Sequence, residues 1–172
     1  QSRKSGNWKV VDTGLPQDHK IFHASIKDSS TCSVNDWFQR LVAAIQADGH
    51  FTAAGKVDMA FSKKRKYYRI MEILRELCIP FKDYSSTHKA YSNGVRYRVS
   101  FTVPDGLYYY LSREDKTFSS RILTDFGIAF CQELRLWDGS FTRAYGEWYC
   151  STNLKNIPIV QALLSICGYR AN

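Results

Sequence analysis

The sequence lacks long hydrophobic runs, paired cysteines and clustered histidines, and each absence excludes a class of protein. No apolar stretch in the 172 residues approaches the roughly 18 that a transmembrane helix needs, so we expect no membrane partner. The segment from Gln1 to Lys9 is polar and basic, which predicts that there is no signal peptide. The five cysteines form no Cys-x-x-Cys pair and the four histidines are scattered, which argues against a zinc site. The cysteines lie in apolar segments, so we expect reduced, buried thiols in an intracellular, cytoplasmic protein.

Acidic residues are also few relative to basic ones. The chain has 16 Asp and Glu against 24 Lys and Arg, which gives a formal net charge of +8. A small basic domain tends to bind a polyanion, although a basic surface that only maintains solubility explains the composition equally well. With 44% hydrophobic and 23% charged residues, the chain is neither disordered nor fibrous, and its length allows one compact domain or two small repeats that share a core.

Hydrophobic periodicity predicts a mixed α+β fold. Apolar residues on nearly all sides, or along one stripe, predict three helices, and alternation of apolar and polar residues predicts strands. Asn93-Gly94 is a strong hairpin signal, and it precedes one of the alternating segments. The predicted helices span about 37–47, 67–78 and 122–137, and the clearest predicted strands span 50–52, 56–62 and 95–103.

Two parts of the chain repeat each other. Residues 48–52 (Asp-Gly-His-Phe-Thr) align with residues 138–142 (Asp-Gly-Ser-Phe-Thr) at an offset of 90, and each follows a predicted helix. An offset of 89 aligns the helix at 73–78 with the apolar segment at 162–167. The order helix, Asp-Gly, hairpin, helix therefore occurs twice, which predicts a pseudo-twofold structure rather than a solenoid.

Asp48 and Asp138 each lie at the predicted C-terminal end of a helix. The macrodipole is negative there, so each carboxylate costs about 0.3 to 1 kcal/mol unless a cation compensates it. A divalent metal ion is a natural partner because hard cations take carboxylate ligands, and two coincidental turns are the alternative. Gly49 would suit the left-handed position that follows a helix.

The first copy resembles the LAGLIDADG motif of homing endonucleases. Residues 41–49 (LVAAIQADG) match that motif in length and in the final Ala-Asp-Gly, and residues 131–139 (CQELRLWDG) resemble the second motif of intein endonuclease domains. The resemblance covers about residues 34–170. It implies a pseudo-twofold α+β fold of two αββαββ-like repeats, with paired motif helices and a saddle-shaped antiparallel sheet. The implied parts are an N-terminal extension (1–33), a first repeat with its linker (34–120) and a shortened second repeat (121–172).

The sequence departs from the family in three places. Glu133 and Trp137 are bulky where the family's motif helices carry small residues, and Glu133 would need a hydrogen-bonding partner. The second repeat is expected to lack its last hairpin, and a strand near 8–11 could dock in its place. Gln1 and the last residues do not match the splicing residues of an intein, so the chain is not expected to splice.

The resemblance implies a monomeric endonuclease that cuts both strands of a long double-stranded DNA target. Asp48 and Asp138, with Gly49 and Gly139 beside them, would hold Mg²⁺, for which Mn²⁺ could substitute, and these ions would activate water against the phosphate. Lys116 matches a lysine that helps to polarise water in intein endonucleases; an exposed linker lysine is the alternative. A catalytically silent or maturase-like relative that binds nucleic acid without cutting, or a domain embedded in an intein, are the other possible functions.

Polar residues of the predicted strands form the candidate DNA surface. A two-stranded ribbon fits the major groove, where arginine can make bidentate contacts to guanine. The basic run 63–66 would contact phosphates, which fixes position without reading sequence. For each residue, a solvated strand face is the alternative. The candidates are His50, Thr52, Lys56, Ser62, Lys63, Lys64, Arg65, Lys66, Arg96, Arg98, Ser140, Thr142, Thr152 and Asn153.

Overall fold

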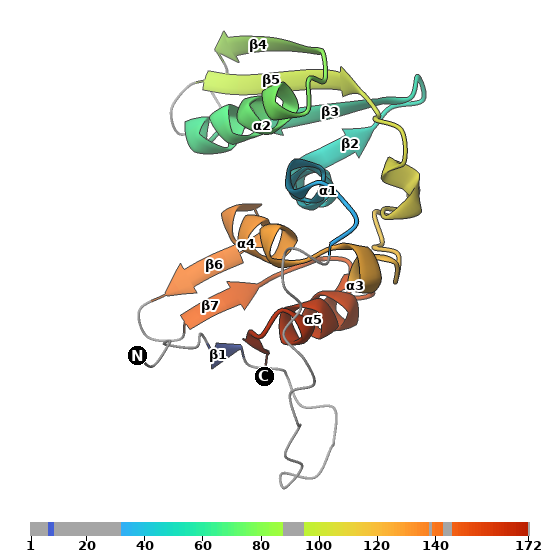
Figure 1. The fold of residues 1–172 in the computed structure, drawn as a ribbon. Coiled ribbons are helices and arrows are strands. Elements are labelled where there is room, and N and C mark those ends of the chain that lie inside the picture. Colours follow the sequence, from blue (N-terminus) through green and yellow to red (C-terminus); the bar gives the residue numbers. More distant parts are fainter. Residues whose placement is uncertain (1–6, 9–31, 88–94, 138, 143–145, 172) are drawn as a thin grey trace, which may run out of the picture.

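The protein folds as two α+β halves that meet at a central pair of helices (Figure 1). The computed structural model describes residues 7–8, 32–87, 95–137, 139–142 and 146–171. Within these residues, no helix combines the length and hydrophobicity that crossing a membrane requires. The α+β class and the pairing of the two motif helices are thus confirmed.

The first half is a four-stranded antiparallel sheet whose inner face is covered by two helices. The strand order is β2-β3-β5-β4, so the second hairpin adds its later strand to the middle of the sheet. The elements are α1 (Asp36–Asp48), β2 (Gly49–Phe51), β3 (Lys56–Phe61), α2 (Lys64–Glu76), β4 (Phe81–Thr87) and β5 (Val95–Thr102).

Strand alternation places the apolar residues of this sheet against the helices. Met59 and Val99, which are paired across β3 and β5, are both buried. They belong to the same core as Leu41 of α1 and Leu74 of α2. The polar residues in between lie on the opposite, outer face, as the alternation predicted.

The second half repeats the order of helix, hairpin and helix. Beside its two-stranded sheet β6-β7, the short strand β1 pairs in parallel with β8 and lies against β7. The expectation that a strand near 8–11 docks beside this hairpin is met by residues 7–8, whereas 9–11 lie outside the described residues. The elements are β1 (Asn7–Trp8), the 3₁₀ helix η2 (Leu107–Tyr109), α3 (Ile122–Asp125), α4 (Ile128–Trp137), β6 (Gly139–Thr142), β7 (Gly146–Tyr149), α5 (Asn156–Ile166) and β8 (Arg170–Ala171).

The two halves follow the same backbone path at an offset of 90 residues. The hairpin register pairs Gly49 with Met59, and it pairs Gly139 with Tyr149. After the helix that follows each hairpin the backbone is also alike: α2 is followed by Cys78 at φ 53°, and α5 by Gly168 at φ 81°. The next backbone N–H then donates to a carbonyl five residues earlier, at 2.8 Å and 2.9 Å respectively. The offset of 89 expected for these helices is therefore wrong by one residue.

The helix predicted over 122–137 is broken at Gly127. Its backbone N–H donates to the side-chain oxygen of Gln39 on α1, at 2.9 Å, instead of to a carbonyl of its own helix. A Cβ atom at this position would also collide with the sulfur of Cys32. The glycine therefore leaves room for Cys32 and lets the start of α4 bind Gln39 of α1, and α3 becomes a separate short helix.

Two further expectations are corrected in the first half. Gly49 is extended (φ −76°, ψ 146°) rather than left-handed, and glycine is required because a Cβ would lie 2.6 Å from the carbonyl oxygen of Ile45. α2 begins at Lys64, three residues before the predicted start, so residues 64–66 of the basic run form the first helical turn.

Cysteine burial and the sheet also differ from expectation. Cys131 and Cys167 are buried, but Cys78 and Cys150 are exposed because each follows the end of an element. The cysteines that the structure describes are not joined in disulfides. In the described part of the chain, the strands form a four-stranded sheet and two two-stranded sheets instead of one continuous saddle.

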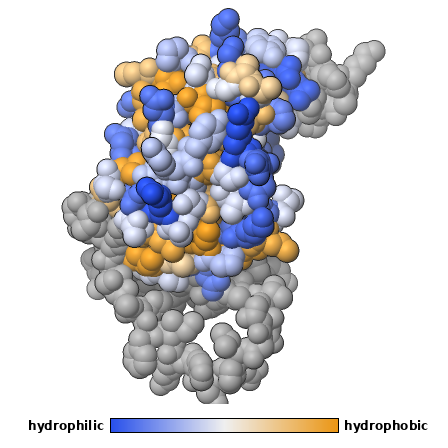
Figure 2. Space-filling model, turned by 90° about the vertical axis from the view of Figure 1, so that its right-hand side faces the viewer, coloured by the Kyte–Doolittle hydropathy of each residue, from blue (hydrophilic) through white to orange (hydrophobic). Residues whose placement is uncertain are grey.

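The segment that connects the halves presents a mixed surface. Figure 2 shows the side of the molecule on which this segment runs: hydrophilic side chains cover much of it, and hydrophobic ones lie between them, both in its upper part and across its lower part. The rings of Tyr108 and Tyr109 on η2 are exposed. The side chain of Arg113 ties the segment to the first half by donating to the carbonyl oxygen of Thr52 at 3.0 Å.

Candidate nucleic-acid interface

The outer face of the four-stranded sheet carries rows of polar side chains. Residues paired across antiparallel strands point to the same side, so the register identifies each row. One row runs His50, Asp58, Ser100 and Lys82 across β2, β3, β5 and β4. The next contains Ala60, Arg98 and Tyr84, with the Arg98 guanidinium 5.5 Å from the centre of the Tyr84 ring.

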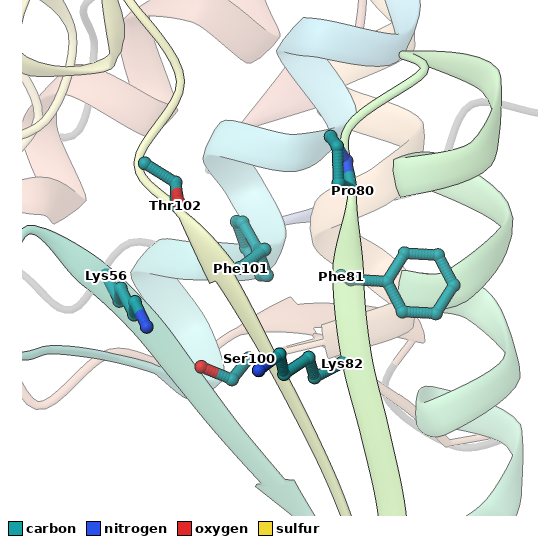
Figure 3. Close-up of a pocket in the computed structure, with 7 residues that line it drawn as sticks. All are labelled: Lys56, Pro80, Phe81, Lys82, Ser100, Phe101 and Thr102. Carbon is teal, nitrogen blue, oxygen red and sulfur yellow. The ribbon is translucent and has the colours of Figure 1, made fainter.

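A notch of 270 Å³ opens on this face across β3, β5 and β4. In Figure 3, the side chains of Lys56 and Lys82 point toward Ser100 from opposite sides, whereas the Phe81 ring points away from them. Two ammonium groups flanking a hydroxyl group can bind an anion such as a phosphate. Lys82 was missed from the sequence because the segment 81–87 shows no clear alternation that would assign it to the outer face.

A second hollow, of 240 Å³, lies where α1 passes into the sheet. Its lining includes the carboxylates of Asp48 and Asp58 and the side chains of His50, Arg96 and Arg98. The predicted candidates on β2 and β5 are thus brought together with the first motif aspartate. This arrangement puts charges of both signs beside a polar sheet face.

Asp48 is the last residue of α1, and it is bound to a lysine. The Lys66 ammonium donates to Asp48 Oδ2 at 2.5 Å, and the two side chains are 15% and 29% exposed respectively. The same ammonium lies 5.5 Å from the centre of the Trp137 ring on α4. The residue expected to contact phosphate therefore neutralises the motif carboxylate.

A divalent metal ion does not fit this carboxylate as the structure places it. Such an ion takes several oxygen ligands, whereas Asp48 Oδ2 is already bonded to an ammonium group. Among the residues that the structure describes, no three His, Cys, Asp or Glu side chains cluster in a way that could hold a metal. Asp138 lies outside the described residues, and Gly139 is placed at the start of β6.

Glu133 has the partners that its burial demands. Its carboxylate is fully buried between the helices and accepts from Arg69 Nε at 2.9 Å, Arg40 Nη1 at 3.1 Å and Trp137 Nε1 at 2.8 Å. The hydrogen bond to Glu133 raises the pKa of the Arg69 guanidinium above its ordinary value. The predicted need for a partner is confirmed, and the cluster joins α1, α2 and α4.

The basic run is only partly available for phosphate. Arg65 Nη1 donates to the carbonyl oxygen of Leu136, at 3.0 Å, near the end of α4. The ammonium of Lys64 lies over the Tyr68 ring, 5.4 Å from its centre, and this neighbour raises the lysine pKa. Lys63 is exposed just before α2.

Lys116 lies in the loop that precedes α3, with φ 55°. Its carbonyl oxygen accepts from Asn156 Nδ2 at 3.0 Å, so this part of the loop is held at the start of α5. Asn153 Nδ2 donates to Thr117 Oγ1 at 2.8 Å and to the carbonyl oxygen of Asp115 at 2.9 Å. The lysine in contact with Asp48 is Lys66, which sequence reasoning had assigned to phosphate.

The remaining candidates divide between the sheet and loops. Thr52 closes the β2–β3 turn, because its hydroxyl accepts from the Lys56 backbone N–H at 3.2 Å. Thr152 and Asn153 lie in the loop before α5 instead of on a predicted strand. Ser62 directly follows β3. Ser140 and Thr142 are on β6, where the structure describes the backbone path alone.

Comparison of the fold with solved structures finds similar domains. The N-terminal LAGLIDADG domain of DUF199/WhiA matches with a TM-score of 0.55 and 12% sequence identity, over 80% of this chain and 68% of that one. Full-length DUF199/WhiA from Thermatoga maritima matches with a TM-score of 0.44 and 13% identity, over 63% of this chain and 34% of that one. No protein-family model and no curated protein matches the sequence. The first of these similarities supports a LAGLIDADG-like fold.

Proposed function

We propose that this chain binds double-stranded DNA through the outer face of its four-stranded sheet. The observation that carries the proposal is the convergence of Lys56 and Lys82 on Ser100, on the same face as Arg98. The net charge of +8 and the LAGLIDADG-like fold support the same partner.

The face divides into two kinds of contact. Lys56 and Lys82 flank the notch and would bind phosphates, which positions the duplex without reading its sequence. Arg96 and Arg98 lie nearer the start of β5 than the notch does, where a strand in the major groove could present them to base edges. Tyr84 supports the Arg98 guanidinium and would keep it extended over the sheet.

The proposal is tested by measuring duplex binding by fluorescence anisotropy, after selection of preferred sequences from a random pool. Lys56→Ala should weaken binding several-fold. Lys155→Ala removes the same charge from the loop before α5, where Lys155 pairs with Asp115, and should leave affinity nearly unchanged. Equal losses in both variants would indicate nonspecific attraction by net charge.

Metal-dependent cleavage of both DNA strands is the second candidate function. It would require Asp48, which lies at the end of the central helix in a hollow shared with Arg96 and Arg98, to release Lys66 and bind a metal ion instead. In this proposal Asp48 and Asp138 hold Mg²⁺ or Mn²⁺ and Lys116 assists. Incubating the selected duplex with either ion distinguishes the two candidates, because cleavage products that vanish in Asp48→Asn and Asp138→Asn would indicate a nuclease.

The chain would act as a monomer, because both motif helices of the pair come from one polypeptide. Light scattering during gel filtration, with and without duplex, tests this. An intein-embedded origin stays a prediction.

A further inference from the structure

The end of α1 needs a cation, and the structure supplies one from the protein itself. Asp48 is placed where the helix dipole is negative, so its charge is unfavourable without a partner. Lys66, from the first turn of α2, donates to its Oδ2 at 2.5 Å. The Lys66 ammonium thus occupies the side of Asp48 at which the motif predicts a divalent metal ion.

We infer that the Lys66 ammonium takes the place of a divalent metal ion at Asp48, so that binding of duplex DNA by this chain does not require a metal. The claim that duplex binding needs no metal rests on the proposed function. The claim that Lys66 replaces a metal ion concerns only the two side chains and their surroundings.

Lys66 is held in position from several directions. Its side chain is 15% exposed and packs over Trp137, whose indole N–H is bonded to the buried Glu133. The helix that carries Lys66 is held against α4 by two further residues of α2, because Arg65 binds the Leu136 carbonyl and Arg69 binds Glu133.

A metal ion would therefore face two obstacles at Asp48. The ammonium would repel a divalent cation at close range, and this repulsion is strong where the side chains are largely removed from water. Moving the ammonium aside would leave it beside an indole ring without its carboxylate partner, which is unfavourable for a partly buried charge. Both obstacles disappear if the lysine is replaced by an uncharged residue of similar length.

In the first experiment, Mn²⁺ is titrated into the full chain without DNA, and binding is measured by calorimetry. Wild type and Lys63→Met, a matched control in the same basic run, should show no binding that depends on Asp48. Lys66→Met should bind Mn²⁺ at least about tenfold more tightly than wild type, and the double variant Lys66→Met/Asp48→Asn should lose that gain. Mn²⁺ binding by wild type that Asp48→Asn abolishes would overturn the inference, as would a Lys66→Met variant that binds no better than wild type.

Lys66→Arg keeps the charge and covers the case in which Lys66→Met does not fold. It should exclude Mn²⁺ as wild type does, and tight Mn²⁺ binding by this variant would contradict the inference. Circular dichroism of each variant reports whether it is folded.

The second experiment compares duplex binding in EDTA and in Mg²⁺ at equal ionic strength. Affinities within about twofold of each other support metal-independent binding, whereas a tenfold gain with Mg²⁺ would overturn it. If the chain binds no duplex in either buffer, the proposed function fails, while the Mn²⁺ titration still decides the role of Lys66.

Discussion

The two halves of the molecule share a hairpin register and helix ends, but they carry different side chains at the position that corresponds to Lys66. At the offset of 90 that relates their hairpins and helix ends, Lys66 corresponds to Asn156. Lys66 binds Asp48, whereas Asn156 is buried and binds the backbone of the loop at 116–118. The duplicated fold therefore supports an ion pair in one half and, in the other, a clamp in which the Asn156 side chain holds the loop at 116–118 by hydrogen bonds.

The central helix pair shows the same division. α1 contributes small residues, with Ala43 and Ala44 fully buried, and α4 contributes the bulk of Trp137 and the charge of Glu133. One helix supplies the space that the other fills. This complementarity lets the pair meet closely although only one copy resembles the motif in its small residues.

The largest expected effect comes from removing the carboxylate between the helices. Glu133→Ala leaves Arg69 without its buried partner and Arg40 without its ion pair, and should lower the free energy of unfolding by about 3 to 5 kcal/mol. Urea denaturation followed by circular dichroism measures this. Glu72→Ala removes an exposed partner of the same Arg69 and should cost no more than about 1 kcal/mol. Similar losses for both would show that burial is not what makes Glu133 important.

The clamp of the second half should have the next largest effect. Asn156→Ala leaves the buried N–H of Phe118 and the carbonyl oxygen of Lys116 without this partner, at a cost of about 1 to 3 kcal/mol. Hydrogen exchange should increase at Phe118 before it increases in the four-stranded sheet. Exchange that increases equally in both places would indicate global rather than local loosening.

The need for a partner could be predicted from the sequence at both sites, but the partner could not. A carboxylate at a helix end or between packed helices requires a cation or donors wherever it occurs. The partners come from elsewhere in the chain: Lys66 lies 18 residues from Asp48, and Arg40 lies 93 residues from Glu133. The predicted start of α2 at residue 67 also left Lys66 outside the helix, although its place in the first turn of α2 directs it toward Asp48.

Local patterns predicted the strands well and the interruptions poorly. Alternation identified the buried face of β3 and β5, because a half-buried strand leaves a period of two in the sequence. Apolar periodicity continues through Gly127, so the break in the predicted helix depends on Gln39 and Cys32, which only the tertiary fold brings there. The same limit applies to Lys82, whose role depends on its pairing with Ser100.

The two motif aspartates should respond differently to neutralisation. Asp48→Asn removes the charge that Lys66 neutralises and should destabilise the fold by about 1 kcal/mol or more, as expected for a partly buried ion pair. Asp138→Asn should destabilise less, because Asn156 stands at the position corresponding to Lys66. Thermal melts of the two variants decide this. A double variant, Asp48→Asn/Lys66→Met, should recover part of the loss if the unpaired lysine is its cause.

Among the sheet residues, the arginines should affect sequence preference. Arg98→Ala should relax preference at one base pair by about 1 to 3 kcal/mol, since it removes a side chain able to contact a base edge. Selection from a random duplex pool with wild type and variant measures this. Tyr84→Phe keeps the ring beneath the guanidinium and should leave the preference intact. A uniform loss across all sequences would assign Arg98 to phosphate instead.

The smallest expected effect is that of a single lysine in the notch. Lys82→Ala should reduce the slope of log affinity against log salt by about 0.9, because one phosphate contact and its released counterion are lost. Sequence preference should not change, since a phosphate contact carries no base information. Lys63→Ala, an exposed lysine of the basic run, is the matched control. A smaller slope change in Lys82→Ala than in the control would move the phosphate contact from the sheet face to the start of α2, and the first half would then bind DNA by its helix end.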